Sequence, residues 1–290
     1  MRLLLLLLSC LLGACASSGS PIQHRFVACD FWKKKLWHVD EARPENNWSA
    51  QVPRIPMEVQ LLPGDQLLIS FNDDGYGVFD LKSRKLVKHH RLPGTSGAWG
   101  LPGGHTLVGL NRGKSIVLAE VDAAGKTVKE TAIPGLHYLR MIRPTAQGTW
   151  LLAWNNGVAE VDLKLAPEKC VIRNFPLPRP RNAYMGIRLA DGRTLVGGGY
   201  AAGLFEYGAD GKFTRELVAP QPPGLSNYFY GGVQELASGR IAVANWTGHD
   251  ARDFKPGWKL IEFDAAGRVV WHWLPADPEV GTINNFVILE

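Results

Sequence analysis

Apolar runs along this chain are short, and one pattern of apolar residue, small turn and second apolar run recurs five times. Clear copies are Leu62–Leu68, Leu101–Leu107 and Leu189–Leu195. The five turn positions follow one another at steps of 39, 44, 44 and 47 residues, and they are Asp65, Gly104, Gly148, Gly192 and Gly239. A period of about 40 to 50 residues that holds several strands is typical of β-propeller blades.

A second pattern, a strand that ends in an acidic turn, keeps the same period. After Asp122 and after Asp264 the chain continues Ala-Ala-Gly, and this glycine supplies the positive φ of a tight turn. Two such patterns per period predict two hairpins, and therefore four short strands, per repeat. Beyond the first residues, no stretch keeps the 3.6-residue apolar period of a helix, so we expect an all-β chain with almost no helix.

The repeats predict how the ring closes. Complete blades are expected near residues 54–93, 94–134, 136–178, 182–220 and 228–275. His24 to Pro53 hold three further strands and Thr282 to Glu290 hold one. Joining these pieces gives a six-bladed β-propeller of four-stranded blades, closed by pairing the C-terminal strand with the N-terminal blade, which leaves no open sheet edge. A long insertion, residues 245–257, is expected between the second and third strands of the last blade, with no role assigned.

The first residues form a separate segment. Residues 1–14 are predicted to be a lipoprotein signal peptide, because Arg2 precedes the leucine run Leu3–Leu8. Leu12-Gly13-Ala14-Cys15 resembles the bacterial lipobox, in which the cysteine is lipidated and becomes the mature N-terminus. An ordinary signal peptide with a small-residue cleavage site is the alternative. Residues 15–23 are then the lipidated cysteine and a flexible tether, and 24–290 a single propeller domain.

This segment also predicts a location. A lipid on Cys15 would hold the chain to the cell envelope, at the outer membrane facing the periplasm if the cell is Gram-negative. The membrane is therefore an expected partner.

Charge and cysteine content exclude several classes of site. A net charge of +5 is mild, and no module of interleaved aromatic and basic residues indicates nucleic-acid binding. Lys33–Lys35 are predicted at a hairpin tip rather than in a phosphate site. Cys29 and Cys170 fall in blades across the ring, so we expect two buried thiols and no disulfide. No metal-spaced set of His or Cys appears, and neither a metal nor a cofactor is predicted.

From about residue 54 onward the chain resembles the bacterial six-bladed PQQ-like propeller proteins, many of them lipoproteins without an assigned activity, and more distantly the arylsulfotransferase propellers. The resemblance rests on four stretches: Arg143–Leu151, Gly192–Val196, Ala244–His249 and Ile261–Trp271. The sulfotransferase-like members carry a His on an inner strand, where this chain has Trp99, with His137 just upstream of the next inner strand. The adjacent cysteines and acidic cluster of quinone-dependent dehydrogenases do not appear.

The innermost strand of each blade should line a central channel, whose entrance is the default small-molecule site. Counting back from each turn places these residues at the entrance: Arg54 or Glu58, Trp99, Arg140, Tyr184, Tyr230, and Asn284 or Asn285. Two arginines among aromatic and amide groups would suit a small anionic ligand. The alternative is that these side chains only fill and solvate the channel mouth.

Three hypotheses on function follow. The favoured one is an envelope-anchored binding or scaffold module for an envelope protein or a small ligand, without catalysis. The second is an enzyme, sulfotransferase-like or hydrolase-like, that acts on an anionic molecule in the channel, with His137 or His249 as general base. The third is a structural part of an outer-membrane assembly machine, by analogy with an eight-bladed lipoprotein, although six blades count against direct equivalence.

Overall fold

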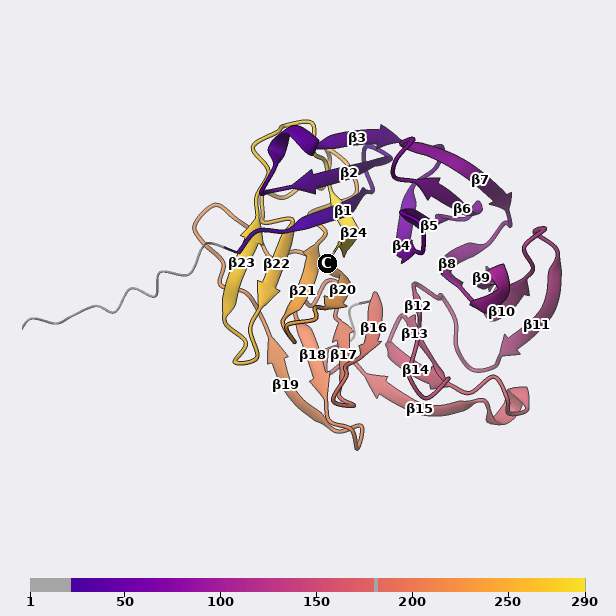
Figure 1. Cartoon of the computed structure of the whole chain (residues 1–290). Coiled ribbons are helices and arrows are strands. Elements are labelled where there is room, and N and C mark those ends of the chain that lie inside the picture. The colour runs from indigo at the N-terminus through magenta and orange to yellow at the C-terminus, as the bar shows by residue number, and fades with distance from the viewer. Residues whose placement is uncertain (1–21, 180–181, 290) are drawn as a thin grey trace, which may run out of the picture.

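The structure, a computed structural model, describes residues 22–179 and 182–289. In this part of the chain 24 strands form six antiparallel sheets of four strands, arranged as blades around a ring (Figure 1). The predicted six-bladed β-propeller is therefore confirmed. Within residues 22–179 and 182–289, helix is confined to three single turns of 3-10 type: η1 (Pro44–Asn46), η2 (Pro102–Gly104) and η3 (Pro167–Lys169).

The blades follow the chain, and each sheet runs from an inner to an outer strand. Blade 1 is β24 (Ile283–Ile288), β1 (Arg25–Asp30), β2 (Lys35–Asp40) and β3 (Trp48–Gln51). Blade 2 is β4 (Pro56–Leu62), β5 (Gln66–Phe71), β6 (Gly75–Asp80) and β7 (Lys85–Arg91). Blade 3 is β8 (Thr95–Gly100), β9 (Thr106–Arg112), β10 (Ser115–Val121) and β11 (Thr127–Ile133).

The other three blades repeat this order. Blade 4 is β12 (Ile142–Pro144), β13 (Trp150–Trp154), β14 (Gly157–Val161) and β15 (Val171–Pro176). Blade 5 is β16 (Met185–Arg188), β17 (Thr194–Gly197), β18 (Leu204–Tyr207) and β19 (Phe213–Leu217). Blade 6 is β20 (Tyr230–Glu235), β21 (Ile241–Asn245), β22 (Leu260–Phe263) and β23 (Val269–Trp273).

The ring closes as predicted, through the C-terminal strand. β24 pairs antiparallel with β1, with Ile288 opposite Phe26 and Phe286 opposite Ala28. Figure 1 shows β24 beside β1 near the centre of the ring, where β4, β8, β12, β16 and β20 also lie. Blade 1 therefore takes its innermost strand from one end of the chain and its other three from the opposite end.

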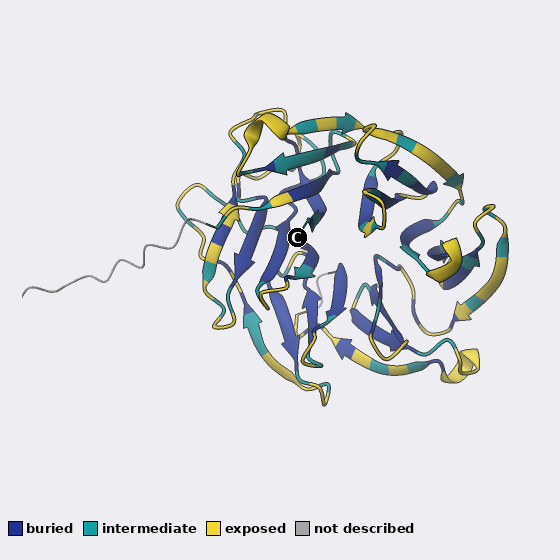
Figure 2. Ribbon diagram, in the orientation of Figure 1, coloured by how far each residue is buried: buried dark blue, intermediate teal, exposed yellow. Residues whose placement is uncertain are grey.

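Burial explains the pattern of apolar and polar residues in the repeats. Middle strands such as β13, with the sequence WLLAW, are buried on both faces against neighbouring blades and are continuously apolar. The outer strand β7 is mostly exposed, with only Leu86 and His90 partly buried (Figure 2). Apolar clusters fill the spaces between blades; one of them joins Leu68 and Tyr76 of blade 2 to Val108 and Val117 of blade 3.

The two recurring patterns meet in space. In four blades the residue after the turn glycine contacts a glutamate on the third strand: His105–Glu120 at 2.7 Å, Thr149–Glu160 at 2.8 Å, Arg193–Glu206 at 2.5 Å and Arg240–Glu262 at 2.8 Å. A β-bulge between the third and fourth strands follows each of these glutamates. Each contact ties the two hairpins of a blade together.

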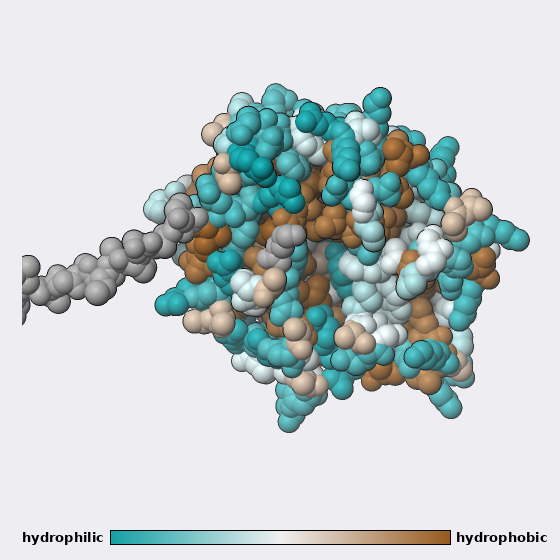
Figure 3. Space-filling model, viewed as in Figure 1, coloured by the Kyte–Doolittle hydropathy of each residue, from teal (hydrophilic) through white to brown (hydrophobic). Residues whose placement is uncertain are grey.

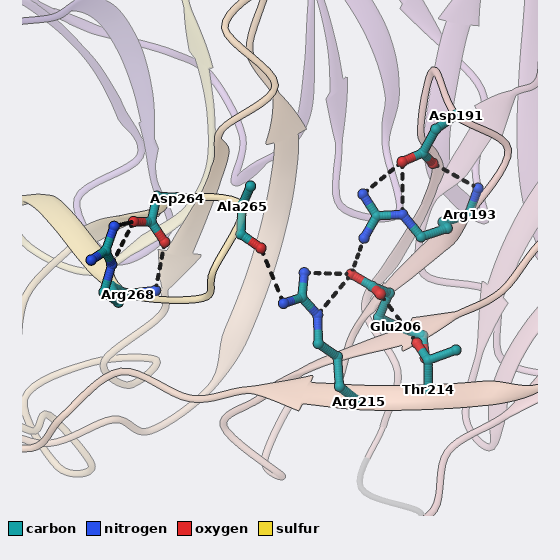
Figure 4. A network of polar contacts seen from close by, with 8 residues as sticks. All are labelled: Asp191, Arg193, Glu206, Thr214, Arg215, Asp264, Ala265 and Arg268. Carbon is teal, nitrogen blue, oxygen red and sulfur yellow. Dashed lines mark hydrogen bonds and ion pairs between the residues drawn. The ribbon is translucent and has the colours of Figure 1, made fainter.

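The contacts of Glu206 are part of a network that extends to the next blade (Figure 4). Its carboxylate accepts hydrogen bonds from Arg193, from Arg215 Nη2 at 3.0 Å and from Thr214 Oγ1 at 3.1 Å. Arg215 Nη1 also donates to the carbonyl of Ala265, at 3.1 Å, in the turn between β22 and β23. This network therefore links blade 5 to blade 6.

Other predictions have definite outcomes. Cys29 and Cys170 are buried free thiols, as expected. Lys33 and Lys34 lie in the turn between β1 and β2, and the 245–257 insertion joins β21 to β22. The signal peptide, Cys15 and the start of the tether lie outside the described residues. In the described ranges, no helix has the length and apolar character needed to cross a membrane.

Candidate functional site

The residues predicted at the channel entrance do not all lie together. Tyr184, Tyr230 and Asn284 are fully buried, at 0% exposure. Arg54 is exposed and paired with Asp74 at 3.4 Å. Arg140 lies just before β12, with its guanidinium 4.5 Å from the ring centre of Tyr138. Trp99, by contrast, lies near the far end of its strand, β8.

The middle of the channel is filled by buried side chains. The Asn284 amide donates to the Tyr184 hydroxyl at 2.9 Å and to the carbonyl of Pro56 at 3.1 Å. Asn285 donates to the carbonyl of Met57 at 3.0 Å. Burial raises the pKa of Tyr184, so its hydroxyl stays neutral. We call this set, Met57, Tyr184, Asn284 and Asn285, the channel plug.

Next to the plug lies a buried ion pair, Glu58–Arg143. Glu58 is 0% exposed, and its carboxylate contacts the Arg143 guanidinium and accepts the backbone N–H of Ala98 at 2.8 Å. Burial lowers the pKa of Arg143 to about 9, which still leaves it protonated at neutral pH. Its guanidinium also lies 4.7 Å from the ring centre of Trp99. Arg143 is thus neutralised from within the protein.

Beyond this pair the channel opens into two adjoining hollows of about 250 and 230 Å³. Six residues, one from each blade, line them at equivalent register positions: Gln60, Trp99, Arg143, Ile187, Gln234 and Val287. We call these six the mouth ring. Figure 3 shows the face of the ring on which the inner strands end, hollowed at its centre and bordered by apolar residues.

Each polar side chain of the mouth ring already makes at least one bond within the protein. The Gln60 amide oxygen accepts the backbone N–H of Gly100 at 2.7 Å, and that of Gln234 accepts Ile288 N–H at 2.8 Å. Arg188, which also lines the second hollow, is paired with Glu160 at 2.6 Å. What remains for a ligand is the apolar surface of Val59, Leu61, Val233 and Phe286 and the indole of Trp99.

A simple count would have found the mouth ring. Gln60, Trp99, Arg143, Ile187 and Gln234 each lie five residues before the turn position of their blade. The sequence-based choice used this offset only for Trp99, whereas Arg140 and Tyr184 lie eight residues before their turns. Three residues along a strand span about 10 Å, so the larger offset leads to the opposite end of the inner strands. Arg143, Gln60 and Gln234 were missed for this reason.

At that opposite end lies the second histidine candidate. His249 Nδ1 is 2.6 Å from Asp253 Oδ2, and its ring lies 4.5 Å from that of Trp246. Although burial raises the pKa of Asp253, hydrogen bonds from the Asp250 amide and from His249 lower it overall, so the carboxylate is charged at neutral pH. A carboxylate in this place orients an imidazole as in a general base. His137 is exposed and packs edge-on against Trp154, with ring centres 5.7 Å apart.

Metal binding has no candidate group in the described ranges. No three or more His, Cys, Asp or Glu side chains of residues 22–179 and 182–289 come together in a way that could hold an ion.

Comparison with known proteins shows a shared fold. No family model and no curated protein matches the chain. Among solved structures, a protein of unknown function from Bacteroides caccae aligns with a TM-score of 0.74 and 22% identity, over 93% of this chain and 99% of that one. A streptogramin B lyase aligns with a TM-score of 0.61 and 13% identity, over 88% of this chain and 84% of that one.

A third similar structure is a catalytically inactive virginiamycin B lyase from Staphylococcus aureus with quinupristin. It aligns with a TM-score of 0.58 and 13% identity, over 92% of each chain. At these identities the similarity is one of fold, and propellers with one fold carry unrelated functions.

Proposed function

We propose that this protein is an envelope-anchored binding module, attached through a lipid on Cys15, that takes a small uncharged ligand in the channel mouth. The observation that carries the proposal is the mouth ring, which encloses an apolar hollow above a plugged channel. An open hollow of about 250 Å³ suits binding of a compact apolar group, since ligand sites are typically apolar with a few polar groups.

Charge decides the ligand class. The two arginines at the mouth, Arg143 and Arg188, are already paired with Glu58 and Glu160. An anion would have to compete with these carboxylates, whereas an uncharged group would contact Trp99 and the surrounding aliphatic side chains directly. The proposed ligand is therefore neutral, in place of the anion expected from the sequence.

Two dyes that differ only in charge test this. N-phenyl-1-naphthylamine is neutral, and 8-anilinonaphthalene-1-sulfonate carries one sulfonate on the same ring system. In fluorescence titrations we expect the neutral dye to bind more tightly, and Trp99→Ala to weaken it about tenfold while Tyr138→Ala at the opposite end leaves it unchanged. Tighter binding of the sulfonate, or no effect of Trp99→Ala, would contradict the proposal.

A second candidate function is catalysis at the opposite end of the channel. It is supported by the 2.6 Å contact between His249 and Asp253, which would orient a general base. Turnover of 4-nitrophenyl sulfate with a phenol acceptor, or of 4-nitrophenyl acetate, would support it if His249→Ala abolishes the rate. Equal rates in wild type and variant would remove His249 from consideration.

A further inference from the structure

A further hollow lies outside the channel, at the seam where the ring closes. It measures about 410 Å³ and lies between β2 and β3 of blade 1 and the segment that follows β23 of blade 6. Three tryptophans line it: Trp37, Trp48 and Trp273. We call it the seam groove, and its volume falls in the range of about 300 to 1,000 Å³ typical of small-molecule sites.

The tryptophans of the seam groove are held in place by contacts with neighbouring side chains. The Trp37 indole donates to Asp30 Oδ2 at 2.9 Å, and its ring lies 5.2 Å from the Lys35 ammonium. Trp48 is stacked on His38 with ring centres 5.1 Å apart. Trp273, only 9% exposed, packs edge-on against Phe26. Indoles that are already ordered lose little conformational entropy when a ligand packs on them.

The rim of the seam groove carries hydrogen-bonding capacity that the protein does not use. The Asn47 oxygen accepts Asp40 N–H at 2.7 Å, which leaves its amide hydrogens free to donate. Asp277 accepts Glu279 N–H at 2.8 Å through Oδ1, which leaves Oδ2 as an acceptor. The Ser49 hydroxyl is exposed and has no partner among the described residues. A donor, an acceptor and a hydroxyl thus border an aromatic surface.

The charge of the seam groove argues against an anionic ligand. Asp277 is its one carboxylate, and the nearby Lys35 lies 3.9 Å from Glu279. Burial lowers the pKa of His38 below its ordinary value, so its imidazole is neutral at pH 7. A ligand of this groove therefore needs an apolar face for the indoles and neutral polar groups for the rim.

We infer that the seam groove is a saccharide-binding site that takes an uncharged pyranose. One face of such a ring presents C–H groups, which pack on the electron-rich face of an indole. Its hydroxyls both donate and accept, as the rim residues require, and unbonded hydroxyls would oppose burial of the ring. The site is independent of the channel mouth.

The test uses maltotriose, cellotriose and chitotriose as probes, with indole as an aromatic control. Saturation-transfer NMR and tryptophan fluorescence of the full chain should show binding of at least one trisaccharide at millimolar concentration. Ala276→Trp, which fills the exposed side of the groove, should weaken that binding at least tenfold. Ala124→Trp, at an exposed turn of blade 3, is the matched control and should leave it unchanged.

Smaller changes at the rim separate recognition from folding. Ser49→Ala removes an exposed hydroxyl, and Asp277→Asn replaces one acceptor oxygen of an exposed carboxylate with an amide donor. Each should weaken binding about two- to tenfold without changing the unfolding midpoint. Binding of indole but of none of the three saccharides would overturn the inference, as would saccharide binding that Ala276→Trp leaves intact.

Discussion

Asn284 donates a 2.9 Å hydrogen bond to the hydroxyl of Tyr184, which lies 100 residues earlier in the chain. The contact runs from β24, the closing strand, to the residue that precedes β16 of blade 5. Both side chains are fully buried. The strand that closes the ring is therefore also bonded across the channel, and closure and plug form one structural unit.

Asn284→Ala should lower the free energy of unfolding by about 2 to 3 kcal/mol, because it removes hydrogen bonds to Tyr184 and Pro56 and leaves buried acceptors without a donor. Tyr184→Phe removes one hydroxyl and should cost about 1 kcal/mol. Urea unfolding measures both. Val87→Ala on the exposed face of β7 is the control, expected within about 0.5 kcal/mol of wild type. An Asn284→Ala variant as stable as this control would show that the plug adds nothing to stability.

Gly97→Ala should destabilise the protein by several kcal/mol. A Cβ at residue 97 would lie 2.6 Å from Oε2 of Glu58 and 3.2 Å from the backbone nitrogen of Ile142. Glu58 cannot move away from this Cβ without breaking its ion pair with Arg143. Overpacking of a buried site costs about 1 to 3 kcal/mol, and disturbance of the ion pair adds to it. Gly100→Ala is the matched control, because its Cβ would meet the flexible end of Leu62 at 3.1 Å and the Gln60 amide oxygen at 3.4 Å, both of which are side-chain atoms. Thermal melting of the two variants should separate them clearly.

The fold could be predicted from the sequence because the blades correspond to local sequence repeats. Turn residues and apolar runs recur in every blade, and at Asp65, Gly104, Gly148, Gly192 and Gly239 the backbone takes the positive φ that such turns require. The closing pair β24–β1 followed from three unmatched strands at the N-terminal end of the pattern and one at the C-terminal end.

The candidate site was harder to predict for a geometric reason. An offset error of three residues, as between Arg140 and Arg143, moves a side chain about 10 Å along an inner strand, from one end of the channel towards the other. Contacts such as Glu58–Arg143 join different blades, and no local sequence pattern predicts them. The seam groove likewise combines Trp37 with Trp273, residues from opposite ends of the chain.

Glu206→Gln should reduce stability at neutral pH, and the loss should vanish in acid. Burial raises the pKa of Glu206, but the hydrogen bonds from Arg215 and Arg193 lower this pKa overall. Its charge therefore contributes stability above the unfolded pKa of about 4.5, and this contribution is lost as the pH falls through the lower folded pKa.

Because both arginines reach solvent, we expect a loss on the order of 2 kcal/mol at pH 7, less than for a fully buried pair. Urea unfolding of variant and wild type from pH 7 to pH 3 measures the difference. A difference that stays constant over this range would show that the carboxylate charge is not its source.

Cys15→Ser tests the proposed anchor. If the lipobox is processed, wild-type chain should incorporate labelled palmitate and sediment with membranes, because acyl chains hold a protein to a bilayer. The serine variant should lose both the label and the membrane fraction. Cys10→Ser, within the leader, is the control and should keep both. Release of unlabelled wild-type chain as a soluble protein would instead indicate an ordinary signal peptide.

Lys259→Met should stabilise the protein at neutral pH. Lys259 is 3% exposed, its ammonium donates to Thr247 Oγ1 at 2.6 Å, and it lies 4.6 Å from the ring centre of Phe254. Burial lowers its pKa to about 8, against the opposing effect of Asp30. Between pH 8 and about 10.5 the unfolded chain therefore holds the proton that the folded chain has released, so wild-type stability rises with pH across this window. Methionine keeps the stem packed and removes the buried charge.

The advantage of the Lys259→Met variant should be largest at pH 7 and shrink towards pH 10, as measured by urea unfolding at each pH. Lys212→Met, at an exposed turn, should show no such trend. A methionine variant that is less stable than wild type at pH 7 would mean that the hydrogen bond to Thr247 and the attraction of Asp30 outweigh the desolvation of the ammonium. The 245–257 insertion, which holds Thr247 and Phe254, would then depend on that charge for its position.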